Sequence, residues 1–231
     1  MTPVQDFEQD NHIQLSEKVA MQLREKIVSG EIKNAQFLRI DTIAKSLGVS
    51  PTPVREGLLL LQSEALVRLI PRRGFQVRSF SRQDLLDLFW AQATIGAELT
   101  ARTATNISRE ALDRLEEIQS GYEEAIKSGD EARTGRIGHE FHRTINKAAN
   151  SPRLAAILGS LTRQLPNQFY ASIEGELSIA ASYHPVILGA IRVNDPSAAA
   201  SLMFKHIIEG GNHLVEVLAE RGMWADGDVN N

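Results

Sequence analysis

Residues 42–58 read TIAKSLGVSPTPVREGL, and residues 66–77 read LVRLIPRRGFQV. Apolar positions at helical spacing stand on both sides of Gly48, which permits a tight turn because it has no side chain. Ser50 is suited to cap the second helix, and Pro51 occupies its first position, where a missing N–H costs nothing. The pattern therefore predicts two helices joined by a tight turn and followed by a short hairpin.

A third helix precedes this pair. Apolar residues recur one helical turn apart from Leu15 to Ile27. We expect Asp41 to cap the next helix, which ends at Leu47, and we expect the helix after the turn to reach Leu66.

The hairpin that follows has a basic tip. We expect strands at residues 67–70 and 75–78, and the tip between them places two arginines between Pro71 and Gly74. Three helices and a small β-hairpin in this order predict a winged helix-turn-helix over residues 12–79.

In such a module the second helix of the pair enters the major groove of double-stranded DNA. Arg55 is the expected base contact, since arginine pairs two donors with guanine; the alternative is a surface ion pair with Glu56 or Glu64. The serine and threonine hydroxyls and the helix N-terminal amides suit phosphates. The tip arginines suit phosphates or the minor groove, unless they form only a solvated tip. The candidate DNA-binding residues are Ser50, Pro51, Thr52, Arg55, Arg72, Arg73 and Gly74.

Charge is distributed unevenly along the chain. Residues 11–78 hold 11 Lys and Arg against 6 Asp and Glu, a net charge of +5, whereas residues 79–231 hold 14 against 20, a net charge of −6. This favours contact of the first part alone with a polyanion. The chain has no cysteine, which excludes disulfides and thiolate zinc sites. Neither a signal-peptide pattern nor a membrane-spanning apolar run is present, so we expect a cytoplasmic protein.

The remainder of the chain predicts an all-α bundle. Capping and helix-breaking residues divide it into about six helices, near residues 82–105, 108–128, 130–150, 152–172, 174–193 and 196–221. We therefore expect a mainly α protein with a disordered lead-in at 1–11, the winged module at 12–79, the bundle at 80–222 and a tail at 223–231.

The run Leu47–Glu56, together with Gly74, resembles the GntR family of bacterial transcriptional regulators. That family usually has Arg where this chain has Pro51, which removes one possible base or phosphate contact but leaves DNA binding expected. The bundle resembles the FCD effector domain of the FadR subgroup. The two resemblances together cover about residues 12–222.

The FCD resemblance implies a divalent metal ion, zinc or nickel, bound by His142, His184 and His206. The family commonly has a carboxylate or amide ligand four residues before the first histidine, where this chain has Gly138. Three histidines with water or an effector oxygen completing the shell remain sound chemistry. His139 points about 100° away and is a poor substitute. The alternative is three interior histidines without metal.

The resemblance also implies a small-molecule effector, such as an organic acid. Gln92 stands where many FCD domains carry a carboxylate-binding Arg, and Gly96 stands where Glu is common. Gln92 and Asn146 are the candidate effector contacts. Gln92 could instead be a helix-interface amide, and Asn146 could cap a neighbouring helix.

These observations together predict a homodimeric DNA-binding regulator, a repressor, whose effector changes the placement of two DNA-binding modules. We expect no enzymatic activity. Two alternatives remain: a hydrolase that uses a three-histidine metal site, and a regulator whose bundle no longer senses an effector.

Overall fold

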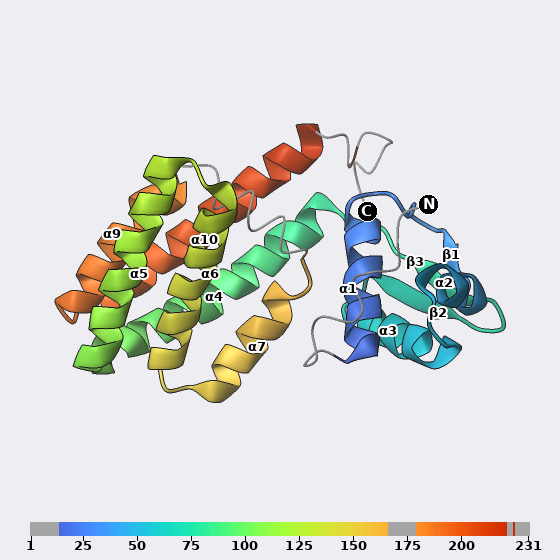
Figure 1. Cartoon of the computed structure of the whole chain (residues 1–231), viewed down its shortest axis with the longest axis horizontal. Helices are drawn as coiled ribbons and strands as arrows, with labels where there is room; N and C mark the ends of the chain where they lie inside the picture. Colours follow the sequence, from blue (N-terminus) through green and yellow to red (C-terminus); the bar gives the residue numbers. More distant parts are fainter. Residues whose placement is uncertain (1–13, 166–178, 221–223, 225–231) are drawn as a thin grey trace. The chain divides into compact units, whose positions relative to one another are not determined.

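The structure is a computed structural model that describes residues 14–165, 179–220 and 224. The chain divides into two compact units after Phe80 (Figure 1). The predicted lead-in and most of the predicted tail lie outside the described residues. Among the helices that are described, none has both the length and the apolar character needed to cross a membrane.

The first unit packs helices around a small antiparallel sheet (Figure 1). The strands lie in the order β1-β3-β2, with Phe37 opposite Gln76 and Val67 opposite Val77. The prediction of a two-stranded hairpin was incomplete, because β1 adds a third strand. The elements are α1 (Leu15–Val28), β1 (Phe37–Leu38), α2 (Ile40–Leu47), α3 (Pro51–Ser63), β2 (Val67–Ile70) and β3 (Gly74–Val77).

The turn between α2 and α3 follows the prediction, but two helix ends do not. Gly48 has a φ of 67°, the left-handed conformation that glycine adopts without strain. Arg39, not Asp41, is the N-cap of α2. Asp41 lies in the first turn of α2, where its carboxylate interacts favourably with the positive end of the helix dipole.

The prediction that α3 reaches Leu66 was wrong. The helix ends at Ser63, and Ala65 has a left-handed φ of 59°. The Leu66 N–H donates to the Leu61 carbonyl and the Ala65 N–H to the Gln62 carbonyl. This pair of bonds is a Schellman motif, which satisfies the last carbonyls of α3 and turns the chain into β2.

The core of the first unit lies between α1, α3 and the sheet. Gly57 brings α3 close to α1, since a Cβ atom at this position would lie 2.9 Å from the backbone oxygen of Ser16. The buried apolar side chains include Val19, Leu23, Ile27, Val54, Leu58, Leu61, Phe75 and Val77.

The second unit is the predicted helical bundle (Figure 1). The Ser81 and Asp84 side chains form a capping box at the start of α4, and the Ser108 and Asp130 side chains cap α5 and α6. α7 is shorter than predicted, and the predicted break at residues 174–175 lies outside the described residues. The helices are α4 (Arg82–Asn106), α5 (Arg109–Ser128), α6 (Glu131–Ala148), α7 (Pro152–Thr162), α9 (Ile179–Arg192) and α10 (Pro196–Glu220).

Glycines bring α4 and α10 into close contact along their length. A Cβ atom at Gly211 of α10 would lie 2.5 Å from the Phe89 ring of α4. A Cβ atom at Gly96 of α4 would lie 2.9 Å from the Ile207 side chain of α10. Ile207 therefore fills the space beside Gly96, and this glycine serves helix packing.

Candidate functional site

The first turn of α3 presents an exposed polar surface. Ser50 is the N-cap in extended conformation, its side chain makes no capping hydrogen bond, and Thr52 and Arg55 are also exposed. The predicted use of backbone amides at this end is limited, because Pro51 and Pro53 have no N–H and Thr52 is the amide donor between them.

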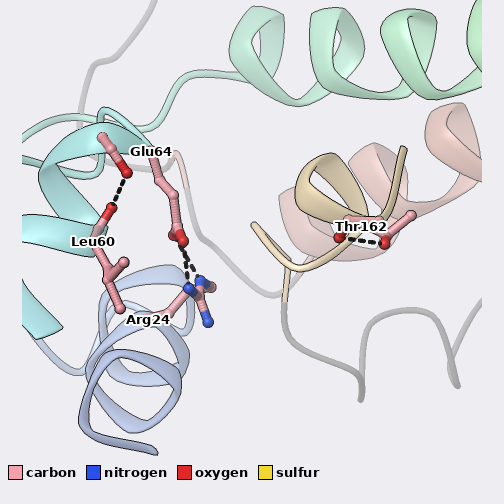
Figure 2. A network of polar contacts seen from close by, with 6 residues as sticks. Arg24, Leu60, Glu64 and Thr162 are labelled. Carbon is pink, nitrogen blue, oxygen red and sulfur yellow. Dashed lines mark hydrogen bonds and ion pairs between the residues drawn. The ribbon is translucent and has the colours of Figure 1, made fainter. Parts of the chain in front are cut away.

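Glu64 does not neutralise the charge of Arg55. The alternative that it pairs with Glu64 was wrong, because Glu64 is held by Arg24 of α1 (Figure 2). Two hydrogen bonds of 2.6 and 2.9 Å join the guanidinium to both carboxylate oxygens. Within the described part of the chain, Arg55 takes part in no ion pair.

The tip between β2 and β3 holds a non-glycine residue in a strained conformation. The Arg73 N–H donates to the Ile70 carbonyl at 3.0 Å, and Arg72 inside this turn has a φ of 64°. A Cβ atom in the left-handed region costs about 1–2 kcal/mol. Both arginines are exposed. Gly74 has a φ of 92°, which explains why a glycine ends the tip.

The sequence prediction missed a polar network that braces the sheet. The Arg68 guanidinium donates two hydrogen bonds to the Gln76 side-chain oxygen, at 2.9 and 3.1 Å. The Gln76 amide in turn donates to the Ala35 carbonyl at 2.8 Å. Gln76 lies between buried Phe75 and Val77 on β3, and this period of two was the signal that could have placed Gln76 and its cross-strand partner Arg68 on the outer face of the sheet.

In the second unit, the structure brings the three predicted histidines together. His142 lies on α6, His184 on α9 and His206 on α10, and their possible ligand atoms all lie within 4.8 Å of one another. The rings of His142 and His206 are nearly parallel, at 3°, and the His184 ring is nearly perpendicular to both. His184 is fully buried and His206 is 3% exposed.

These distances fit ligands of one metal ion. The Nε2 atoms of His142 and His206 are 3.1 Å apart. Two nitrogens that each lie about 2.1 Å from one ion are about 3.0 Å apart in octahedral and about 3.4 Å apart in tetrahedral geometry. A direct hydrogen bond between the two rings is the alternative. No carboxylate or cysteine joins this group within the described residues.

Aromatic rings surround the histidines. Phe141 stacks on His184 with ring centroids 4.3 Å apart, and Tyr122 lies 4.9 Å from the same ring. The Tyr183 ring lies 5.6 Å from His206, and its hydroxyl donates to Glu209 at 2.6 Å. This hydrogen bond, together with burial, raises the pKa of Tyr183.

The remaining candidates take different places. Gln92 is 3% exposed on α4, and Asn146 is half-buried on α6, one turn after His142. Gly138 is buried and His139 exposed, in agreement with the expectation that His139 points away from the cluster.

The first unit has the fold that reads DNA with the second helix of a helix-turn-helix and a basic wing, and the second is a helical bundle in which three histidines lie together. This combination defines a DNA-binding transcriptional regulator with an effector domain.

The chain belongs to the GntR family of bacterial regulatory proteins and carries an FCD domain. The model described as "Bacterial regulatory proteins, gntR family" matches residues 15–77, and the model described as "FCD domain" matches residues 87–209.

Named relatives agree with this assignment. The chain is 25% identical over 188 residues to the HTH-type transcriptional regulator McbR of Escherichia coli strain K12, covering 80% of this chain and 85% of McbR. It is 27% identical over 197 residues to a probable D-xylose utilization operon transcriptional repressor of Paenarthrobacter nicotinovorans, covering 82% of this chain and 85% of that protein. The solved structure of E. coli McbR/YncC has the same fold, with a TM-score of 0.63 at 22% identity over 91% of this chain and 99% of that chain.

Proposed function

We propose that the protein is a homodimeric repressor that acts in the cytoplasm and releases or binds its operator in response to a small-molecule effector. Two copies of α3 would enter successive major grooves of a near-palindromic site, because one copy reads only one half-site. The observation that carries this proposal is Arg55, which is exposed near the start of α3 and forms no ion pair within the described residues.

The residues at the start of α3 and at the hairpin tip contact different parts of the DNA. Arg55 contacts base edges, with guanine as the preferred partner. The Ser50 and Thr52 hydroxyls fix the register on phosphates, beside Pro51 at the first helical position. Arg72 and Arg73 add cationic contacts from the tip, and Gly74 allows the backbone to approach the duplex.

We assign the metal ligands to His142, His184 and His206, which would hold zinc or nickel. When bound, a divalent ion supplies a positive charge and an open position for an oxygen ligand. The three imidazoles are neutral ligands, so they leave the charge of the ion uncompensated. This favours an anionic effector such as an organic acid, even though Gln92 offers no charge of its own.

The bundle's own residues orient the effector. Gln92 on α4 and Asn146 on α6 supply neutral amides that donate and accept hydrogen bonds. The DNA-binding units can take two arrangements, and the effector binds one of them more tightly than the other. The change in operator affinity can be no larger than this difference in effector affinity. We assign no catalytic residue.

Two measurements on the intact protein test this proposal. Native mass spectrometry with elemental analysis of gently purified protein should give twice the chain mass of 25.5 kDa and about one zinc or nickel ion per chain. Binding to the protein's own promoter should exceed binding to a scrambled duplex at moderate ionic strength.

The matched variant changes His142, His184 and His206 together to Ala, and it should lose the metal but keep operator binding without effector. Equal affinity of the native protein for promoter and scrambled duplex would overturn the regulator. Hydrolysis of test esters by the metal-loaded protein, abolished in this variant, would favour the hydrolase alternative.

A further inference from the structure

Two exposed leucines follow one another on α3. Leu59 is 48% exposed and Leu60 is 39% exposed, whereas Val54, Leu58 and Leu61 of the same helix are buried. A single exposed leucine is ordinary on a protein surface. Successive residues of an α-helix point about 100° apart, however, so these two leucines belong to different surfaces. Each is therefore assigned by the residues that share its side of the helix.

Leu60 lies on the side of α3 that borders α1. It stands three residues after Gly57 and four residues before Glu64, and such positions share one side of a helix. A Cβ atom at Gly57 would lie 2.9 Å from the backbone oxygen of Ser16 in α1. Glu64 forms its ion pair with Arg24 of α1. Leu60 thus lies along the contact between the two helices.

Leu59 lies on the face of α3 that carries the expected DNA contacts. By helix geometry it points about 40° from Arg55, one turn earlier, and about 20° from Thr52, two turns earlier. All three side chains are exposed. The buried Val54 and Leu61 point about 140° and about 160° away from Leu59. Leu59 therefore faces away from the core, in nearly the same direction as the polar residues that would read the operator.

We propose that Leu59 contacts the methyl group of a thymine in the major groove and so specifies one base of the operator; this rests on the proposed DNA-binding function. A leucine side chain forms no hydrogen bond with a phosphate or a base edge, so it adds affinity only where the DNA surface is apolar. The C5-methyl group of thymine is the apolar group that base pairs present in the major groove. Contact removes the apolar surface of both groups from water.

The dimensions of α3 fit this contact. The helix has 13 residues and is about 20 Å long, and its width of about 10–12 Å matches the width of the major groove, about 12 Å. Along the helix axis Leu59 lies about 6 Å beyond Arg55, which corresponds to about two base pairs at 3.4 Å per pair. We therefore expect the thymine about two base pairs from the guanine that Arg55 contacts.

The first test changes the DNA and keeps the native protein. Each thymine in one half-site of the promoter duplex is replaced in turn by deoxyuridine, which lacks the C5-methyl group and keeps every hydrogen-bonding group. Fluorescence anisotropy should show binding about fourfold weaker at one of these positions, the factor that corresponds to one buried methyl group. The same replacements in a scrambled duplex should have no effect, because non-specific binding depends on phosphates.

The second test asks which residue senses the methyl group. Leu59→Ala should bind the thymine and the deoxyuridine duplexes equally, and Leu59→Gln, which keeps the length of the side chain but not its apolar end, should do the same. Leu60→Ala is the matched control, because Leu60 is the same residue type but points about 140° from Arg55. It should keep the fourfold difference. Thr52→Ser, which removes only a methyl group, should keep it too. Circular dichroism checks that each variant folds.

The outcomes separate this contact from the proposed function. A native protein that prefers its promoter over the scrambled duplex but responds to none of the deoxyuridine replacements overturns the role of Leu59 alone. A fourfold difference that persists in Leu59→Ala assigns the methyl contact to another residue and overturns that role as well. Equal binding of the native protein to promoter and scrambled duplex overturns the regulator itself.

Discussion

The two units use their polar residues in opposite ways. The first unit leaves Arg55 and the tip arginines exposed, ready for an external polyanion. The second unit buries His184 and His206 among aromatic rings, where the proposed metal ion would lie inside the bundle. The difference teaches that one site is made by a short continuous segment, whereas the other exists only after three helices have packed. A substitution that abolishes one site should therefore leave the other site intact.

The largest expected effect is on the buried cluster. His142→Ala should lower metal affinity at least about a thousandfold, beyond the tenfold to hundredfold loss typical of residues outside the ligand set. Isothermal titration with zinc or nickel measures it. His139→Ala is the matched control, because His139 lies on the same helix but is exposed. Loss of metal-free operator binding in His142→Ala would show that the two units do not separate as described.

A second prediction concerns the ion pair between Arg24 and Glu64 in the first unit. Arg24→Ala should lower the free energy of unfolding by about 3 kcal/mol, because Glu64 would stay nearly buried at the C-terminal end of α3 without its partner. Urea unfolding measures this. Lys26→Ala breaks an exposed pair with Glu31 and should cost less than about 1 kcal/mol. Similar costs for the two variants would contradict the importance of burial.

Arg55→Ala should weaken binding to the native operator by about 1–3 kcal/mol and relax sequence preference. Fluorescence anisotropy on native and scrambled duplexes separates the two effects. An equal loss on both duplexes would make Arg55 a phosphate contact and not a base contact.

The double substitution Arg72→Ala with Arg73→Ala should mainly reduce the dependence of DNA binding on salt concentration. If each arginine neutralises one phosphate, the slope of log affinity against log salt concentration becomes shallower by about 1.8. Titrations at several salt concentrations give this slope. An unchanged slope would place the tip away from the duplex.

The smallest expected effect concerns the end of α3. Ala65→Gly should raise the free energy of unfolding by about 1 kcal/mol or less, since glycine removes the left-handed strain but adds freedom to the unfolded chain. Thermal or urea unfolding measures it. A destabilised variant would show that the Ala65 Cβ contributes more by packing than its backbone costs.

The sequence predicted best where structure depends on neighbouring residues. The turn at Gly48 and the start of α3 after Ser50 were found from the sequence, because a turn or helix start needs only a few adjacent residues, although Ser50 makes no capping hydrogen bond and Asp41 is not the cap of α2.

Two errors have the same physical origin. β1 has two residues, too few for an alternating pattern, and its pairing with β3 depends on contacts across the chain. Ala65 adopts a conformation that usually calls for glycine, so its residue type gave no stop signal to α3.

The histidine cluster was predicted from a family resemblance, since no local pattern brings together residues separated by 64 positions. The exposure of Trp90 was not predicted at all, because helical spacing places apolar residues on a face but does not say whether that face is covered.

The close approach at Gly96 and Gly211 has a mechanical consequence. Ile207 follows His206 directly and fills the gap beside Gly96, and the Phe89 ring fills the gap beside Gly211. A close-packed contact has no free volume to absorb a displacement. A shift of α10 at His206 would therefore displace α4 with it.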